Sequence, residues 1–341
     1  MITKFKKLKR PIIITEISGN HNGSKKSFLS HIKIAAKNGA DIIKIQTYEP
    51  EDITLKKFDK SFKIKKGTWK GQYLWDLYKK AHTPFKWHGE AFKLAKKLKI
   101  PIFSSPFSKR AVDLLEKLRV PIYKIASFEI TDLELIKYIA KKKKPIIIST
   151  GMANLFEIKR AINCIKKYNN KITILYCVSG YPSKEQDINL KSLNRLKKTF
   201  KNYKIGLSDH TDDIYSSFAA TTLGVSVIEK HFIISKKIKS ADNKFSIDPH
   251  QLQHLKKGIK KICLSLGKEN LGLKKVEKNS LKLRRSIFSI KDIKKGEKFN
   301  KHNIRSYRPK IGVGSEYFET LIGKKSKKNI SKFTPIFKNV F

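Results

Sequence analysis

The chain has 341 residues, of which 40% are hydrophobic, and its 76 Lys and Arg against 28 Asp and Glu give a formal net charge of +48. No run of about 18 apolar residues occurs, so we expect no membrane-spanning helix and no membrane partner. The basic residues are spread over the whole length without a nucleic-acid-binding signature, so we expect no specific nucleic acid partner, and the charge favours small anionic substrates.

Eight short apolar segments alternate with amphipathic stretches in the first 266 residues. The segments are rich in Ile and Val and end at Pro, Gly or polar residues, which is typical of strands buried on both faces. Strands are predicted at 11–17, 41–46, 100–105, 121–127, 145–150, 172–177, 204–208 and 225–230. Helices are predicted at 25–38, 84–98, 109–118, 133–140, 155–167, 190–200, 215–223 and 249–266. Eight such units in series predict an α/β fold, a closed (β/α)8 TIM barrel, and an open doubly wound sheet is the alternative.

The pattern changes after the barrel domain, which we predict to be residues 1–266. Residues 267–284 are polar and weakly periodic, and we interpret them as a linker. Residues 285–341 combine short strand patterns with glycine turns and predict a small β-rich domain. A domain of roughly sixty residues is marginal alone, so we expect it to pack on another surface.

Cysteine usage and the amino-terminal segment both indicate a cytoplasmic protein. Cys164, Cys177 and Cys263 are odd in number and far apart, which predicts a reducing compartment without a disulfide framework. No CxxC pair occurs, so a cysteine-based structural zinc site is not expected. The apolar part of residues 1–17 is too short for a signal peptide, and we interpret this segment as the lead-in to the first strand.

Polar side chains follow nearly every predicted strand. They are Glu16, Lys44, Gln46, Ser105, Lys124, Ser127, Glu129, Ser149, Thr150, Cys177, Ser179, Ser208, His210, Glu229 and His231. One polar residue at the start of a loop means little, because loops are polar in general. Their recurrence at six or more strand ends predicts a site, because the active site of such a barrel lies at the carboxyl ends of its strands.

Lys44 and Lys124 each interrupt an apolar strand, where an unpaired lysine is costly. One interpretation is a pair of structural lysines that are salt-bridged or reach water with their ammonium groups. Another is a binding site in which two ammonium groups face a compact anion and serine hydroxyls complete its hydrogen bonds. A Schiff-base lysine, as in an aldolase, is the third.

His210 and His231 end the seventh and eighth predicted strands, which are neighbours in a closed barrel. Two neutral imidazoles from adjacent strands predict half of a divalent-metal site, with open positions for water and substrate. The alternative is two ordinary polar histidines at loop starts. No HExxH or triple-histidine spacing occurs, so a closed zinc site is not favoured.

Seven motifs, in chain order, carry a family resemblance: TEISGNHNG, GADIIKIQTY, SSPF, YKIASFE, PIIISTGM, GLSDHT and EKHF. Together they resemble the sialic acid synthase family, whose members condense phosphoenolpyruvate with an amino sugar to make nonulosonic acids. Near the carboxyl terminus, IKDIKKGE and YRPKIGVG resemble the antifreeze-like (SAF) domain of that family.

The subfamily rests on fewer residues. Residues 67–88 are more similar to pseudaminic acid synthases than to N-acetylneuraminate synthases, and Ser179 stands where the latter usually carry asparagine. An ordinary amphipathic helix with aromatic anchors is the alternative interpretation of 67–88. N-acetylneuraminate and legionaminate synthases of the same family remain alternatives.

The resemblance implies a carbon–carbon bond-forming transferase and assigns roles to the residues above. Catalytic residues are Glu16, Lys44, Lys124, Glu129 and Asp209, with the water proton assigned to Glu16, Glu129 or Asp209. Phosphoenolpyruvate is bound by Lys44, Ser105, Lys124, Ser127, Ser149, Ser179 and Ser208. The acetamido sugar is bound by Gln46, Glu129, Tyr181, Asp242 and Arg308, and Mn²⁺ or Mg²⁺ by His210 and His231.

The resemblance also implies a domain-swapped homodimer, in which the SAF domain covers the barrel of the partner chain. Two interpretations of other kinds stay open on the residues alone. One is a Schiff-base aldolase that uses Lys124 or Lys44, and the other is a basic nucleic-acid-binding protein.

Overall fold

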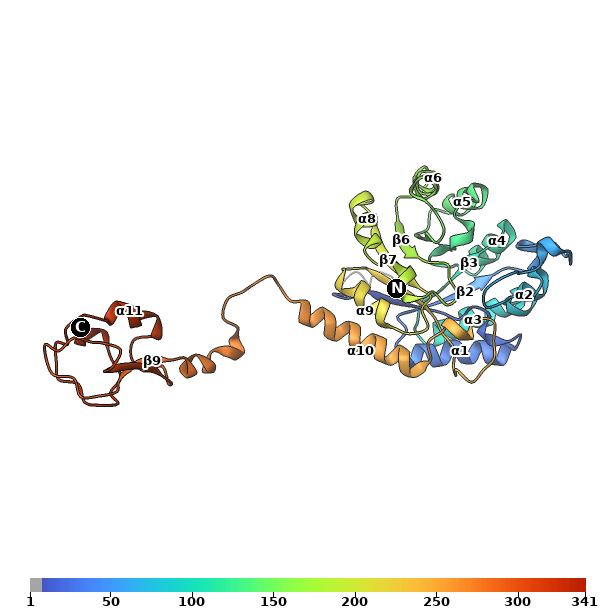
Figure 1. The fold of residues 1–341 in the computed structure, drawn as a ribbon. Helices are drawn as coiled ribbons and strands as arrows, with labels where there is room; N and C mark the ends of the chain where they lie inside the picture. The colour runs from blue at the N-terminus through green and yellow to red at the C-terminus, as the bar shows by residue number, and fades with distance from the viewer. Residues whose placement is uncertain (1–7) are drawn as a thin grey trace. The chain divides into compact units, whose positions relative to one another are not determined.

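The computed structural model describes residues 8–341. Residues 1–7, the beginning of the predicted lead-in, lie outside the described residues. The chain divides into two compact units, one that ends at Gly267 and one of Lys268–Phe341. The first unit is a closed barrel of parallel strands with helices around it (Figure 1). The predicted TIM barrel is therefore confirmed, and the open sheet is wrong. No helix within residues 8–341 is both long and apolar enough to cross a membrane.

The eight predicted strands all form, and their ends shift by only a few residues. They are β1 (Ile12–Glu16), β2 (Ile42–Thr47), β3 (Ile102–Pro106), β4 (Tyr123–Ile125), β5 (Ile146–Ser149), β6 (Ile172–Cys177), β7 (Lys204–Asp209) and β8 (Val227–His231). Each strand pairs in parallel with the next, and β8 pairs with β1 to close the barrel. Closure leaves no strand edge and buries the isoleucine-rich strands on both faces.

Within residues 8–267, ten α-helices belong to the first unit, and five of them begin at a side chain that caps the first turn. They are α1 (Lys25–Asn38), α2 (Leu74–Ala81), α3 (Phe85–Lys97), α4 (Lys109–Lys117), α5 (Leu133–Ala140), α6 (Leu155–Lys166), α7 (Glu185–Ile188), α8 (Ser192–Thr199), α9 (Tyr215–Thr222) and α10 (Pro249–Leu266). Ser24, Ser108, Asp132, Asn154 and Asp248 each accept a hydrogen bond from a backbone N–H of the first turn. Among these helices, α7 has no counterpart in the sequence-based prediction, and α2 lies within residues 67–88, for which an amphipathic helix was the alternative interpretation.

The strand register brings distant residues into contact at the carboxyl ends. Glu16 on β1 is paired with Lys44 on β2 and with His231 on β8. Successive side chains of a strand point to opposite faces of the sheet. Asp209 and Lys230, which are paired across β7 and β8, therefore lie on the face opposite to that of the strand neighbours Ser208 and Glu229.

The second unit is less regular than predicted. It contains one antiparallel pair, β9 (Ser286–Ser289) and β10 (Ile304–Tyr307), and the short helix α11 (Phe318–Leu321). Elsewhere in this unit only isolated β-bridges form, such as Ile293 with Ile330. The polar stretch 267–284 carries two 3₁₀ helices, η7 (Lys275–Glu277) and η8 (Asn279–Leu283). The small hydrophobic core of the second unit consists of Ile287, Ile293, Phe299, Ile304, Val313, Leu321, Ile330 and Ile336.

Candidate active site

A cavity of about 560 Å³ lies in the first unit and is lined from the carboxyl ends of the barrel strands. Most of the predicted site residues line it: Glu16, Lys44, Gln46, Lys124, Ser127, Glu129, Ser149, Tyr181, Ser208, His210, His231 and Asp242. Ser105 is the β3 residue paired with Gln46, and Ser179 follows β6. Asp209 is not among the lining residues of the cavity, and Arg308 belongs to the second unit.

Two lysines and two glutamates from four strands form an ion-pair network in this cavity. Lys44 Nζ lies 2.7 Å from Glu16 Oε2 and 2.9 Å from Glu229 Oε1. Lys124 Nζ lies 3.4 Å from the same Glu229 oxygen, which also accepts a hydrogen bond of 2.9 Å from Ser208. The lysines are thus salt-bridged and line the cavity at the same time. Two of the three roles considered for them from the sequence, structural lysines and anion-binding lysines, therefore do not exclude each other.

Burial and pairing give these groups different proton affinities. Burial on its own lowers the pKa of both lysines, but at Lys44 the contacts with Glu16 and Glu229 outweigh it and raise the pKa. At Lys124 burial prevails and lowers the pKa. Burial raises the pKa of Glu129 to about 7. Among these groups Glu129 is therefore the one suited to exchange a proton near neutral pH.

Buried polar atoms without a hydrogen-bond partner gather around the cavity. Within residues 8–341, the unpartnered buried side-chain atoms include the hydroxyls of three predicted serines and one atom each of three ionisable side chains. They belong to Ser105, Ser149, Ser179, Glu129, Glu229 and His231. Native proteins satisfy nearly all buried polar groups, so such a concentration at one end of the barrel indicates a site built for a polar ligand.

The two predicted metal-binding histidines lie next to each other, with ring centroids 5.3 Å apart. His210 Nδ1 is 2.9 Å from the carbonyl oxygen of Val178, which can only accept, so Nδ1 carries the proton and Nε2 keeps a lone pair. His231 Nε2 is 3.2 Å from Glu16 Oε2 and donates to it, and Nδ1 of the same ring is buried, makes no hydrogen bond and lies 3.7 Å from Asp242 Oδ2. Burial lowers the pKa of His231 and favours its neutral form. In spite of burial, the neighbouring Cys177 raises the pKa of His210. In its neutral form each ring offers a donor atom that fits a divalent metal ion.

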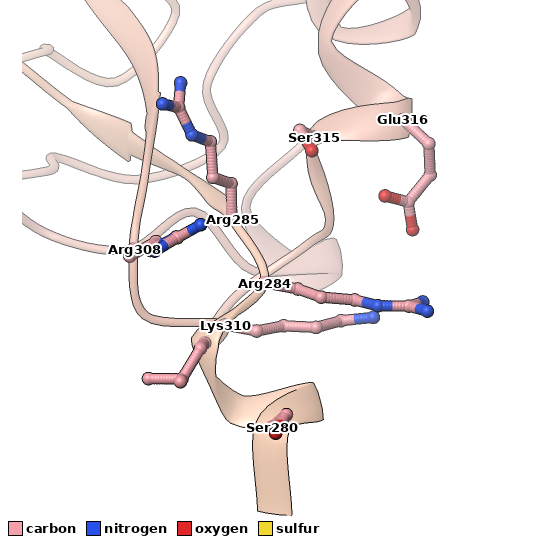
Figure 2. A pocket seen from close by; sticks show the side chains of 8 residues that line it. Ser280, Arg284, Arg285, Arg308, Lys310, Ser315 and Glu316 are labelled. Atoms are coloured by element: carbon pink, nitrogen blue, oxygen red, sulfur yellow. The ribbon is translucent and has the colours of Figure 1, made fainter. Parts of the chain in front are cut away.

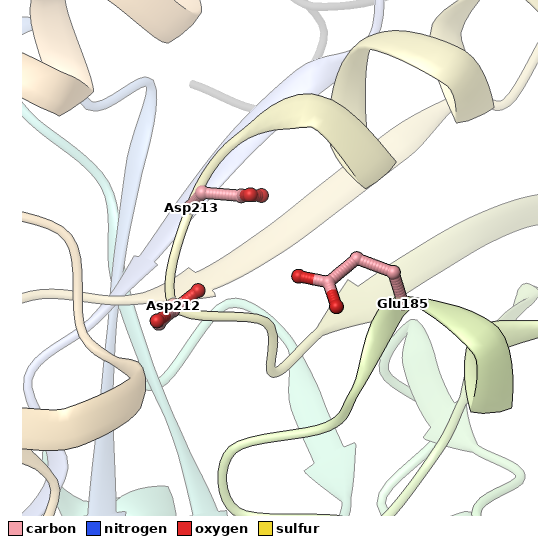
Figure 3. Close-up of side chains that lie close together, drawn as sticks. All are labelled: Glu185, Asp212 and Asp213. Atoms are coloured by element: carbon pink, nitrogen blue, oxygen red, sulfur yellow. The ribbon is translucent and has the colours of Figure 1, made fainter.

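A separate acidic cluster consists of Glu185, Asp212 and Asp213 (Figure 3). Glu185 lies at the start of α7, and Asp212 and Asp213 lie in the loop after β7. The three side chains are exposed or half-buried. Exposed acidic groups of this kind are ordinary surface features, and this cluster contains neither of the predicted histidines. We assign it no metal.

Asp209 is the one predicted catalytic residue that the structure places away from the cavity. Its carboxylate is fully buried, lies 3.1 Å from Lys230 Nζ, and accepts hydrogen bonds from Ser217 and Thr211. The alternation of β7 turns it to the face opposite Ser208, toward α9. The prediction of a proton-transfer role for Asp209 is therefore corrected to a structural role.

Several lining residues had no role in the sequence-based assignment. Glu229 was noted only as a polar strand end, although it bridges both lysines. Ser18, Tyr48, Trp69 and Tyr78 also line the cavity, and three of them lie in the long segment between β2 and α3. The aromatic residues of that segment were a signal for Trp69 and Tyr78, but nothing local to the sequence indicated which aromatic rings reach the cavity.

Arg308 lines a different cavity, of about 510 Å³, within the second unit (Figure 2). Its neighbours there include Arg284, Arg285 and Lys310, and Glu316 is the one acidic side chain of the lining. The cavity is therefore strongly cationic. This is a suitable environment for an anionic or strongly polar group.

Two family models match this chain, one for each of its two units. Residues 31–271 match the NeuB family, and residues 284–339 match the SAF domain. The chain belongs to the NeuB family. The predicted resemblance is thereby confirmed for both parts of this NeuB-family chain.

Named relatives of this NeuB-family chain include a pseudaminic acid synthase of Helicobacter pylori, 43% identical over 96% of this chain and 97% of the relative. A pseudaminic acid synthase of Campylobacter jejuni is 42% identical over 96% of each chain. An N,N'-diacetyllegionaminic acid synthase of Campylobacter jejuni is 39% identical over 94% of this chain and 97% of the relative. Among solved structures, an N-acetylneuraminic acid synthetase of Leptospira borgpetersenii has a TM-score of 0.71 and 29% identity, over 80% of this chain and 91% of the other.

Proposed function

We propose that the chain is a pseudaminic acid synthase, which condenses phosphoenolpyruvate with 2,4-diacetamido-2,4,6-trideoxy-β-L-altropyranose to give pseudaminate and phosphate. Three pseudaminic acid synthases at 40 to 43% identity over 96% of the chain support the assignment. The observation that carries it in the structure is the set of unpartnered polar atoms around a cavity that holds two lysines. We place the enzyme in the cytoplasm, which cell fractionation tests.

Lys44 and Lys124 attract the anionic groups of phosphoenolpyruvate, and the serine hydroxyls donate hydrogen bonds to them. The donors are Ser105, Ser127, Ser149, Ser179 and Ser208. Carbon 3 of phosphoenolpyruvate attacks the aldehyde of the open-chain sugar, water adds to carbon 2, and phosphate leaves by carbon–oxygen cleavage. Glu129 takes the proton of that water, since its pKa of about 7 suits the task. Gln46, Tyr181 and Asp242 hold the sugar.

His210 and His231 would hold a divalent metal ion, Mn²⁺ or Mg²⁺, through the donor atoms that their other hydrogen bonds leave available. Charge balance also favours a cation, because the carboxylates of Glu16, Glu229 and Asp242 outnumber the two lysines in the cavity. The metal supplies Lewis acidity toward the aldehyde oxygen.

Chelation is expected to abolish turnover, and added Mn²⁺ is expected to restore it in the wild type but not in His210→Ala or His231→Ala. Full phosphate release in the presence of a chelator would remove the metal from this account.

Arg308 binds the sugar from the partner chain of a homodimer in this proposal. A planar guanidinium suits polar recognition at an interface, and Arg308 lies in a cationic cavity. Mixing inactive His210→Ala with impaired Arg308→Ala after reversible dissociation is expected to restore activity. A heterodimer would combine the intact barrel of one chain with the intact Arg308 of the other. Heterodimers without activity would mean that Arg308 acts on the barrel of its own chain or has no role in the site.

A sugar panel tests the function directly. The chain is incubated with phosphoenolpyruvate, Mn²⁺ and one acetamido sugar at a time, and phosphate release is followed. Release is expected with 2,4-diacetamido-2,4,6-trideoxy-altrose and little with N-acetylmannosamine. Preference for the legionaminic acid precursor would select the second candidate, which the 39% identical relative favours. Preference for N-acetylmannosamine would contradict the pseudaminic acid assignment within the family.

A further inference from the structure

One side of the cavity is apolar, and it is built by a segment outside the barrel strands. Ile53, Ile64, Leu74 and Leu77, here called the apolar wall, all line the cavity. They come from the long connection between β2 and α3, and the last two lie on helix α2. Leu77 is buried, whereas the other three are only half-buried. Half-buried aliphatic side chains gathered in one cavity indicate contact with an apolar part of a ligand.

The wall is held in place by hydrogen bonds to the loops that follow β6 and β8. Ile64 pairs with Gln72 in a short antiparallel turn, through an N–H···O bond of 2.9 Å. At the end of that turn, Trp69 Nε1 donates to the carbonyl oxygen of Ala241 at 2.8 Å, and the Thr68 hydroxyl donates to that of Tyr181. The Trp69 and Tyr181 rings lie 5.4 Å apart. These contacts tie the segment to the loops after β6 and β8, so the wall is a positioned surface of the site.

The charged groups and the serine hydroxyls of the cavity lie elsewhere. The lysines, serines and histidines come from the strand ends, where the reacting atoms of both substrates must meet. An open-chain six-carbon sugar whose carbon 1 lies at the strand ends must direct carbon 6 away from them, toward the connecting segments. The apolar wall belongs to such a segment, and its four side chains offer aliphatic carbon but no hydrogen-bond donor or acceptor. The same segment also brings Tyr48, Trp69 and Tyr78 to the cavity, and the indole N–H of Trp69 is already bonded to Ala241.

We infer that the apolar wall receives the carbon 6 methyl group of a 6-deoxy acetamido sugar and is the element that rejects sugars with a hydroxyl at carbon 6. The inference rests on the proposed function and names its specificity determinant. A methyl group gains from contact with leucine and isoleucine, whereas a hydroxyl there would lose its hydrogen bonds to water without replacement. Discrimination of this kind by an apolar pocket is worth about 10- to 200-fold in kcat/KM.

The test compares two sugars that differ only at carbon 6: 2,4-diacetamido-2,4,6-trideoxy-altrose and its 6-hydroxy analogue. The quantity measured is the ratio of their kcat/KM values. Leu74→Asn puts an amide into the wall at a half-buried position and is expected to lower the ratio about tenfold. Leu74→Met keeps the wall apolar and is expected to retain the ratio. Lys79→Asn, an exposed change on the same helix, is the matched control and is expected to leave the ratio unchanged.

Leu77→Asn, which changes the buried residue of the wall, is a second variant with the same expected fall in the ratio. The KM for phosphoenolpyruvate is expected to stay the same in all four variants, which distinguishes loss of the wall from loss of folding. An unchanged ratio in folded Leu74→Asn and Leu77→Asn would overturn the inference while leaving the proposed function in place. Wild-type protein that releases no phosphate with any acetamido sugar would overturn both.

Discussion

Replacing Asp209 by asparagine is expected to damage stability and leave the chemistry intact. The Asp209 carboxylate and the Lys230 ammonium are both fully buried and 3.1 Å apart. Lys230 also donates to the carbonyl oxygen of Thr211 at 2.6 Å, and the Ser217 hydroxyl donates to Asp209 at 2.5 Å. Asparagine removes the negative charge but not the positive one, so the ammonium stays buried without its partner.

The expected loss is about 3 to 5 kcal/mol, the usual cost of removing one member of a buried ion pair. For a domain of this size each kcal/mol shifts Tm by roughly 2 to 4 °C, so Tm is expected to fall by about 6 to 20 °C. Asp209→Asn with Lys230→Met is expected to recover part of this loss, since no buried ammonium remains. Recovery is partial because asparagine keeps one acceptor oxygen where aspartate has two, so Ser217 and Thr211 cannot both keep their acceptor.

The assay combines thermal unfolding, followed by circular dichroism, with steady-state kinetics well below Tm. Asp209→Asn is expected to keep the wild-type kcat and KM, because Asp209 does not line the cavity. Glu129→Gln is the matched control: it is expected to unfold near the wild-type temperature and to lose about 10²- to 10⁴-fold in kcat. If Asp209→Asn lost kcat at an unchanged Tm, the assignment of Asp209 to a structural role would be refuted.

Burial lowers the pKa of His21 and of His88 to about 4, so the unfolded chain binds more protons than the folded one as pH falls from about 6.5 to 4. The free energy of unfolding is therefore expected to fall by about 2 kcal/mol per histidine between pH 7 and pH 5. In urea titrations at the two pH values, His88→Gln is expected to lose less free energy of unfolding than the wild type, by the contribution of His88. A loss as large as that of the wild type would contradict this. A Cβ at Gly151 would lie 2.1 Å from the Ser179 hydroxyl oxygen and 2.8 Å from that of Ser127. Gly151→Ala is thus expected to displace both hydroxyls and raise the KM for phosphoenolpyruvate roughly tenfold in initial-rate measurements, and a rise confined to the KM of the sugar would count against their role.

Much of the barrel and of its site could be predicted because both depend on local patterns. Apolar runs bounded by Pro, Gly or polar residues predicted all eight strands, and the polar residues at their ends predicted the lysines, glutamates and histidines of the cavity lining. Asp209 was expected at the site but lies away from the cavity, because the pattern Ser208-Asp209-His210 does not reveal which residues point inward. One residue of register reverses the face of every side chain, and register is set by the neighbouring strands.

By itself, the sequence determined where strands and helices form, since period, capping and turn residues act over a few positions. The tertiary structure decided which charges meet. Glu229 bridges Lys44 and Lys124 only because closure of the barrel brings β8, β2 and β4 around one cavity. It also decided that the connection between β2 and α3 folds back over this cavity, with Trp69 bound to the loop after β8. Such contacts join residues more than a hundred positions apart, and no local pattern encodes them.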